Sequence, residues 1–223
     1  MPQFQPILFQ SGFLKSVDLG FWKIEEDIPD LISLLPDASC TSKAPYVQYK
    51  SVKRRKEWLS VRVLLAKMLG ADAAIHYLES GKPYLAGGGR AISISHTNGL
   101  AAIAVSVQPV GIDIEQVGAR AYHLRNYFLQ DDEYDFSEIE NPELFATFLW
   151  SAKESVYKLY DLPGLELKAG IRTSVFRRES NSLILEARVE GSSQLSQVYC
   201  CLMEDAVFTC ARYVGDDSED LLY

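Results

Sequence analysis

The chain has 223 residues, of which 48% are hydrophobic and 23% are charged, a composition typical of folded globular proteins and not of disordered ones. Its 30 acidic and 22 basic side chains give a formal net charge of −8, which argues against a protein whose main partner is bulk nucleic acid. The four cysteines have no C-x-x-C spacing, so we expect buried free thiols and no structural zinc site. No apolar run reaches the roughly 18 residues of a membrane helix, and the N-terminus lacks the basic region of a secretion signal. We therefore expect a cytoplasmic protein with no membrane partner.

The first part of the chain reads as strands around one long helix. A short strand near 19–24 and a short helix near 27–35 are followed by a long helical pattern over 46–70. The β-like segments AIHYLES, PYLA, AISIS and LAAIAVSV come next, and Asn98-Gly99 between the last two predicts a hairpin.

The second part repeats this order. Helical stretches at 121–138 and 142–160 precede four predicted strands, near 171–178, 182–190, 197–203 and 206–213. Strands combined with one long helix in each part indicate an α+β fold. We predict two similar halves, residues 1–108 and 109–223, that form a pseudodimer, although the halves share no clear sequence identity.

Two carboxylates alternate with apolar residues in the segment VGIDIEQV. In a strand, Asp113 and Glu115 project to one side while Ile112 and Ile114 face the core. Paired carboxylates repel each other unless a cation lies between them, and such oxygen ligands suit Mg²⁺. An exposed strand with a polar outer face fits the spacing equally well.

The segment 143–160 predicts an amphipathic helix with three polar-face residues in a row. Trp150, Glu154 and Lys158 follow each other at i, i+4 spacing opposite the apolar face. Glu154 and Lys158 are either an exposed ion pair or a metal carboxylate and a phosphate contact. Trp150 is not needed by the apolar face, so we expect it to pack against another element.

Two further segments contain residues suited to binding an anion. Ser95, His96 and Thr97 lie at a predicted strand end, where hydroxyl and imidazole groups can bind phosphate, and Lys82 lies in the turn Gly-Lys-Pro. A basic run at the start of the long helix forms either a solvated face or part of an anion site. It contains Lys50, Lys53, Arg54, Arg55 and Lys56.

Read in order, the segments GKPYL, SISHT, VGIDIE, FLQDDEY and FLWSAKESVYKL resemble one family. They are similar to the 4'-phosphopantetheinyl transferases of the two-halved type that activates surfactin synthetase. The resemblance covers about residues 81–158, and its four main motif blocks occur in the family's order. It implies a pseudodimer of two α+β halves that binds coenzyme A in the cleft between them.

The resemblance also implies roles for individual residues. Asp113, Glu115 and Glu154 correspond to the ligands of a Mg²⁺ ion that the family binds together with the pyrophosphate of coenzyme A. Lys158 corresponds to the lysine that contacts this pyrophosphate, and Glu133 to a carboxylate proposed as general base.

Three residues correspond to the coenzyme pocket: Lys82, Ser95 and His96. Trp150 and Lys153 belong to the signature and are expected to have structural roles. The resemblance does not locate the 3'-phosphate site, for which Lys53, Arg54, Arg55 and Arg62 are candidates.

The activity implied by the resemblance is a Mg²⁺-dependent transfer of 4'-phosphopantetheine from coenzyme A. The acceptor is a serine of an apo acyl, peptidyl or aryl carrier protein, and 3',5'-ADP leaves. Two alternatives stay open: another Mg²⁺-dependent phosphohydrolase, and a catalytically degenerate protein that binds coenzyme A. Since two halves already complete the fold, we expect a monomer, with no nucleic acid partner.

Overall fold

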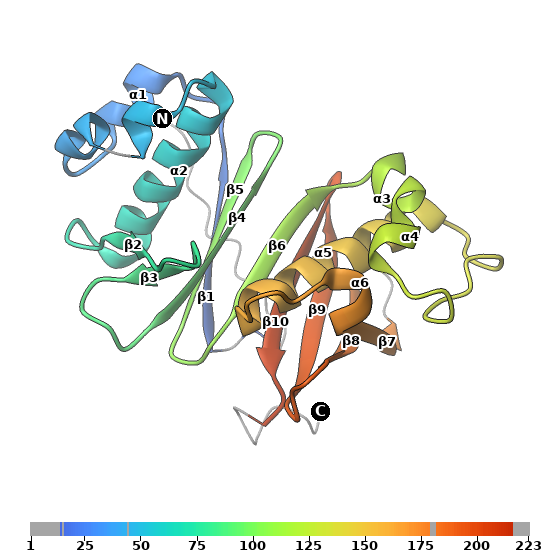
Figure 1. Ribbon diagram of the computed structural model, residues 1–223. Coiled ribbons are helices and arrows are strands. Elements are labelled where there is room, and N and C mark those ends of the chain that lie inside the picture. Colours follow the sequence, from blue (N-terminus) through green and yellow to red (C-terminus); the bar gives the residue numbers. More distant parts are fainter. Residues whose placement is uncertain (1–13, 15, 44, 179–181, 216–223) are drawn as a thin grey trace.

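The computed structural model describes residues 14, 16–43, 45–178 and 182–215 (Figure 1). The N-terminal segment in which we found no secretion signal lies largely outside the described residues. Within the part that is described, no helix is both long enough and apolar enough to cross a membrane. The chain forms two lobes, each with an antiparallel sheet and one long helix (Figure 1).

The first lobe is built on a three-stranded sheet in the order β1-β5-β4, with a separate two-stranded ribbon. The strands are β1 (Val17–Lys23), β4 (Ala91–Thr97) and β5 (Leu100–Ser106), and the ribbon pairs β2 (Ile75–Tyr77) with β3 (Pro83–Leu85). Asn98 and Gly99 form the two-residue turn between β4 and β5. Gly99 has a φ of +82°, which glycine adopts without strain. The predicted hairpin is confirmed.

Helix α2 (Val52–Leu69) packs on this sheet. It begins later than the predicted start at Tyr46, because Ser51 caps it by accepting a hydrogen bond from the Arg54 amide at 3.4 Å. The residues before this cap form a separate turn, and Tyr49 is extended. The other helical elements of the lobe are α1 (Ile28–Ser33), η2 (Ala38–Ser42) and η3 (Tyr46–Gln48).

The second lobe is a five-stranded antiparallel sheet in the order β6-β10-β9-β8-β7. Its strands are β6 (Gly111–Gln116), β7 (Ile171–Arg178), β8 (Ser182–Val189), β9 (Leu195–Met203) and β10 (Ala206–Tyr213). Helix α5 (Pro142–Tyr160) lies across the sheet and buries Phe145, Leu149 and Val156 against it (Figure 1). Short helices complete the lobe: α3 (Ala119–His123), α4 (Arg125–Phe128) and α6 (Leu167–Gly170).

The predicted helical stretch over 121–138 is confirmed only up to Phe128, as the two short helices α3 and α4, and is wrong beyond it. The chain leaves the helical conformation at Leu129, which has φ −105° and ψ 145°. The carbonyl of Phe128 accepts a hydrogen bond from the Lys153 ammonium at 2.8 Å, so it is satisfied without a further helical turn. The helix at 142–160 and the four C-terminal strands are confirmed.

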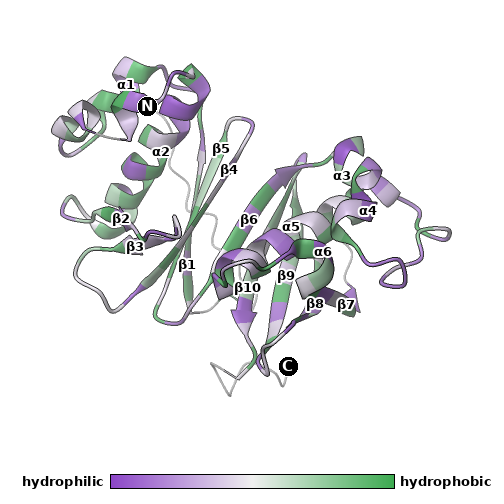
Figure 2. Cartoon of the chain, in the orientation of Figure 1, coloured by the Kyte–Doolittle hydropathy of each residue, from purple (hydrophilic) through white to green (hydrophobic). Residues whose placement is uncertain are grey.

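Strand β5 is buried on both faces, which explains its continuous apolar sequence (Figure 2). Ile103 and Val105 face α2, with Leu64 among their partners. The small residues Ala102 and Ala104 face the second lobe. The sheet of the first lobe is therefore a central layer between α2 and the second lobe.

The two lobes are joined where β4 lies beside β6. No ladder pairs these strands; instead, serine hydroxyls of β4 accept hydrogen bonds from backbone amides of β6. Ser93 Oγ is 2.9 Å from Ile112 N, and Ser95 Oγ is 3.2 Å from Ile114 N. Both lobes share a long helix on an antiparallel sheet, but the sheets have three and five strands. The pseudodimer stays a prediction.

Candidate functional site

The candidate site is built around the carboxylate of Asp113 on β6, at the junction of the two lobes. Its Oδ1 accepts hydrogen bonds from Lys158 Nζ at 2.7 Å and Ser95 Oγ at 2.8 Å. Its Oδ2 accepts one from Ser151 Oγ at 2.9 Å. Asp113 is buried, so its negative charge needs these donors. They come from β4 and α5, and the carboxylate thus connects both lobes.

Lys158 is the nearest cation to this carboxylate. Besides Asp113, its ammonium donates to the carbonyl of Ile112 at 3.0 Å and to Ser95 Oγ at 3.2 Å. The Lys158 side chain is 28% exposed, whereas that of Asp113 is 7% exposed. Lys158 is therefore fixed on one side and accessible on the other, as a contact for an anionic ligand must be.

Glu115 and Glu154 complete a group of three acidic residues. Burial, followed by the neighbouring Asp113, raises the pKa of Glu115, although the indole N–H of Trp150 donates to its Oε1 at 3.1 Å. Burial and Asp113 also raise the pKa of Glu154, and Lys158 lowers it. The charged forms of Glu115 and Glu154 are thus disfavoured by burial and by the charge of Asp113, and a nearby cation would favour them.

The described residues contain no group of three or more His, Cys, Asp or Glu side chains that could hold a metal ion as they stand. In this arrangement Lys158 and Ser151 take both oxygens of Asp113. Glu115 and Glu154 are partly exposed carboxylates, which is a donor type that suits Mg²⁺. The donor chemistry fits a magnesium ion, and the three-carboxylate site stays a prediction.

His96, at the end of β4, lies among charged residues of α2. Its Nε2 is 2.9 Å from Arg54 Nη1, and its Nδ1 is 3.4 Å from Glu57 Oε2. Because the guanidinium can only donate, His96 accepts at Nε2 and carries its proton at Nδ1. Burial, then the cations Arg54 and Lys158, lowers the pKa of His96, against the effect of Glu57.

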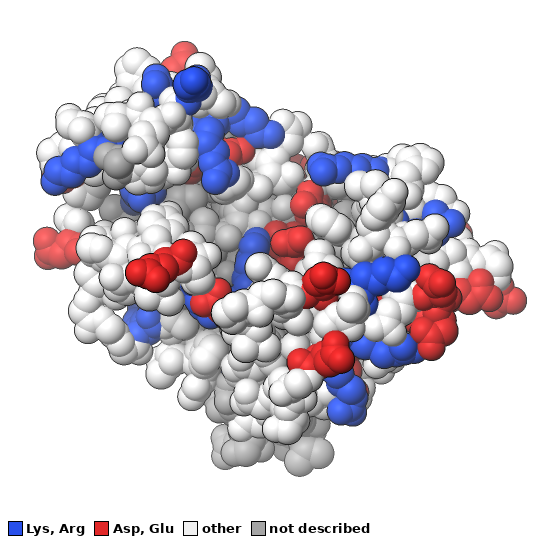
Figure 3. All heavy atoms as spheres, in the orientation of Figure 1, with Lys and Arg blue, Asp and Glu red and all other residues white. Residues whose placement is uncertain are grey.

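A cavity of about 280 Å³ opens next to His96 and Lys158. It lies between the first lobe and the C-terminal part of α5, where Figure 3 shows a hollow with acidic and basic side chains along it. Lys82 lines it and donates to the carbonyl of Leu159 at 3.3 Å. The cavity is also lined by Arg54, Tyr77, Ser80, Gly81, Pro83, Ile92, Ser93, Ile94, Tyr157 and Asp161.

Sequence reasoning expected Lys82, Ser95 and His96 in one pocket, and the structure brings the three together in part. Lys82 and His96 lie on the cavity wall. Ser95 is buried, and its hydroxyl donates to Asp113 instead.

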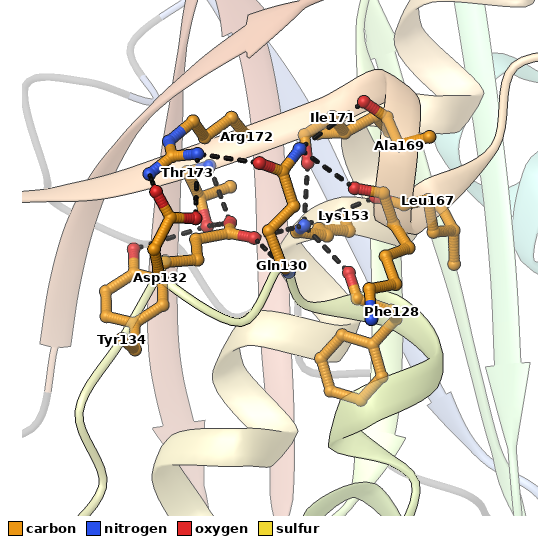
Figure 4. A network of polar contacts seen from close by, with 12 residues as sticks. Phe128, Gln130, Asp132, Tyr134, Lys153, Leu167, Ala169, Ile171, Arg172 and Thr173 are labelled. Atoms are coloured by element: carbon orange, nitrogen blue, oxygen red, sulfur yellow. Dashed lines mark hydrogen bonds and ion pairs between the residues drawn. The ribbon is translucent and has the colours of Figure 1, made fainter.

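Glu133 lies apart from this group. Its side chain is fully buried and forms an ion pair with Lys153 at 2.8 Å. Thr173 donates to its other oxygen from both the amide and the hydroxyl, each at 2.8 Å (Figure 4). The structure does not bring Glu133 to Asp113, Glu115 and Glu154, and its assignment as general base has no geometric support.

Comparison with known proteins gives a family match over the second lobe. Residues 109–211 match the family model described as the 4'-phosphopantetheinyl transferase superfamily. Over these residues, which form the second lobe, the chain is similar to that superfamily. The matched region contains Asp113, Glu115, Glu133, Glu154 and Lys158, whereas Lys82, Ser95 and His96 precede it.

Curated transferases are similar over parts of their length. The transferase AcpT of Salmonella typhimurium is 35% identical over 112 residues, 47% of this chain and 58% of that protein. The 4'-phosphopantetheinyl transferase of Bacillus subtilis is 32% identical over 105 residues, 44% of this chain and 47% of that protein. The transferase gsp of Aneurinibacillus migulanus is 27% identical over 154 residues, 64% and 65% of the two chains. The chain thus spans about half to two thirds of these relatives.

Several residues around the candidate site were missed by sequence reasoning. Ser151 connects Asp113 to Thr209 of β10, whose hydroxyl lies 3.0 Å from that of Ser151. The position of Ser151 in the segment WSAKES could have indicated this role, since a hydroxyl on the α5 face toward β6 can donate to a carboxylate of that strand. Nothing in the sequence marked Thr209, or Glu57 of the first lobe.

Proposed function

We propose that this protein transfers the 4'-phosphopantetheine arm of coenzyme A to a serine of an apo carrier protein, with release of 3',5'-ADP. The observation that carries the proposal is the Asp113–Lys158 pair at the lobe junction, beside a cavity lined by His96 and Lys82. The superfamily match supports the same reaction. The carrier is an acyl, peptidyl or aryl carrier protein, and we propose that the enzyme acts as a cytoplasmic monomer.

The cavity suits the phosphate groups of coenzyme A. Lys82, Arg54 and Lys158 bring three cations to its wall, and His96 adds a ring nitrogen. The net charge of the whole chain is −8, so an anionic ligand depends on such a local cluster. Binding across this cavity would fix the coenzyme to both lobes, because Lys82 belongs to the first lobe and Lys158 to the second.

The proposal includes a Mg²⁺ ion held by Glu115 and Glu154, with Asp113 beside them. When bound, the ion neutralises and orients the pyrophosphate oxygens of coenzyme A. Without it, the three carboxylates repel the substrate as well as each other. Burial and Asp113 raise the pKa values of Glu115 and Glu154, which means that their charged forms are disfavoured without a cation. A bound cation would stabilise these charged forms, and this supports a metal site here.

Lys158 supplies the fixed positive charge of the reaction. The serine hydroxyl attacks the β-phosphorus of coenzyme A, the bond to the bridging oxygen breaks, and 3',5'-ADP leaves with the electron pair. Phosphoryl transfer depends on positioning and on neutralising charge on the leaving side. Asp113, Ser95 and the Ile112 carbonyl hold the ammonium in place for this role. The proton of the serine passes to solvent or to a phosphate oxygen, since Glu133 is buried elsewhere.

Intact-mass spectrometry of an apo carrier protein tests the proposal. The carrier is incubated with this protein, coenzyme A and Mg²⁺, with chelator in a parallel sample. We expect the carrier to gain one phosphopantetheine only when Mg²⁺ is present. Coenzyme A binding without any gain across acyl, peptidyl and aryl carriers would indicate a degenerate binding protein. Release of inorganic phosphate without a carrier would indicate a phosphohydrolase.

A further inference from the structure

A fully buried ion pair in the second lobe lies outside the proposed coenzyme cavity. The ammonium of Lys153 lies within hydrogen-bond distance of four acceptors, which share its three N–H groups: the carbonyls of Phe128 at 2.8 Å, Leu167 at 3.2 Å and Ile171 at 2.6 Å, and Glu133 at 2.8 Å. Figure 4 shows Phe128, Leu167 and Ile171 arranged around the end of the Lys153 side chain. Lys153 thereby ties α5 to the residues after α4, to α6 and to β7.

The carboxylate of Glu133 has no position left for a reacting serine. Its Oε1 accepts both donors of Thr173, and its Oε2 accepts from Lys153 and from the amide of Gln130 at 3.1 Å. The side chains of Glu133 and Lys153 are both 0% exposed. A general base must come within hydrogen-bond reach of the proton that it takes. Glu133 is closed off from any substrate in this arrangement.

The pair is nevertheless connected to the acidic group by a short series of contacts. Lys153 fixes the backbone of Phe128, whose ring packs edge-on against Trp150 with 5.1 Å between the ring centroids. The indole N–H of Trp150 donates to Glu115 at 3.1 Å. Trp150 and Lys153 lie three residues apart on α5, so both ends of this series are anchored on one helix.

We propose that Glu133 and Lys153 are positioning residues that set the orientation of the Glu115 carboxylate through Phe128 and Trp150. This inference rests on the proposed function, in which Glu115 helps to hold Mg²⁺. Groups that orient a metal ligand from outside the coordination sphere typically change metal affinity by about 10–100-fold when they are removed. The inference therefore assigns Glu133 an effect on Mg²⁺ dependence and none on proton transfer.

The first experiment needs neither metal nor substrate. The indole N–H resonance of Trp150 is identified by NMR from its loss in Trp150→Phe. Glu133→Gln is then compared with Asp132→Asn, a matched control that removes the neighbouring, exposed acid paired with Arg172. We expect Glu133→Gln to shift the Trp150 resonance and Asp132→Asn to leave it in place. An unshifted resonance in Glu133→Gln would overturn the inference, whether or not the protein transfers phosphopantetheine.

The second experiment measures the Mg²⁺ concentration for half-maximal transfer, together with kcat at saturating Mg²⁺. We expect Glu133→Gln to raise the half-saturating concentration about tenfold, with much smaller effects on kcat and on the pH profile. In a Trp150→Phe background, Glu133→Gln should add no further change, because the series of contacts is already broken. A general base would instead lower kcat by about 10²–10⁴-fold, flatten the acid limb of the pH profile and act equally in both backgrounds.

Phe128→Leu keeps the inference testable even if Glu133→Gln does not fold. This substitution leaves Glu133 and Lys153 intact but removes the ring that packs on Trp150. We expect it to move the Trp150 resonance and to raise the half-saturating Mg²⁺ concentration. Wild-type values for both in a folded Phe128→Leu protein would refute the positioning role.

Discussion

Replacement of Gly111 by alanine tests the packing that brings Asp113 and Lys158 together. A Cβ atom at this position would lie 2.0 Å from the carbonyl oxygen of Ser155 and 2.6 Å from the amide nitrogen of Leu159. Ordinary van der Waals contact begins at 3.4 Å, and both atoms belong to the α5 backbone. The helix cannot yield as a flexible side chain would, so α5 and β6 must separate.

We expect Gly111→Ala to lower the free energy of unfolding by about 2–3 kcal/mol, within the usual range for overpacking a core. For a chain of this length, this corresponds to a fall in Tm of about 4–12 °C. The displaced helix should also weaken the contact between Lys158 and Asp113, now 2.7 Å, and reduce transfer. Thermal unfolding followed by circular dichroism and the carrier mass assay measure the two effects.

Gly118→Ala is the matched control for this experiment. A Cβ atom at Gly118 would meet no atom within 4 Å, and its φ of 174° is extended backbone that any residue adopts. Its Tm and transfer rate should equal those of the wild type. If Gly111→Ala behaves like Gly118→Ala, the close approach of α5 to β6 is not a requirement of the fold, and the packing argument fails.

Three further variants test the charged groups. Burial and neighbouring carboxylates raise the pKa of Glu154 above 4.5 in the folded chain. The folded state therefore keeps the Glu154 proton to higher pH than the unfolded chain does. As a result, the free energy of unfolding without metal falls as pH rises through that raised pKa. Glu154→Gln should therefore flatten this fall in chemical denaturation at pH values above 4.5 while it removes transfer, and an unchanged or steeper fall would contradict the reasoning. Lys158→Ala should raise KM for coenzyme A and leave KM for the carrier little changed in steady-state assays. Arg54→Gln should weaken coenzyme A binding by about tenfold in calorimetry, whereas unchanged affinity would exclude Arg54 from the coenzyme site.

Much of the fold could be predicted because its patterns are local. The alternation in the strands, the Asn98-Gly99 turn and the apolar face of α5 each depend on neighbouring residues. The end of the helical stretch at Phe128 could not be predicted, because Lys153 binds the Phe128 carbonyl from 25 residues further along the chain. Such tertiary contacts leave no periodic signal in the local sequence.

The acidic residues of the candidate site could also be predicted, because their spacing is a local pattern. Asp113 and Glu115 interrupt an apolar strand at i, i+2, and Glu154 and Lys158 share a helix face. The resemblance to known transferases then indicated which of these faces meet. What sequence could not give is the role of Ser151 and Thr209, or the burial of Glu133, since these depend on how α5, β10 and β7 pack together. Glu133 lies in an acidic segment, so its burial could not be inferred without its partners Lys153 on α5 and Thr173 on β7.

The segment WSAKES shows how one helix serves packing and chemistry at the same time. Ser151 and Ser155 are small enough to let α5 approach β6, where Gly111 contributes no side chain. Because the backbones lie so close, the Ser151 hydroxyl reaches Asp113 directly, and Lys158, further along the helix, reaches the same carboxylate from the cavity side. A larger residue at Gly111 would therefore disturb the charge arrangement even though it bears no charge itself. The contacts of Ser151 and Lys158 with Asp113 depend on the close packing of α5 on β6. Stability and transfer should therefore fall together when Gly111 is replaced.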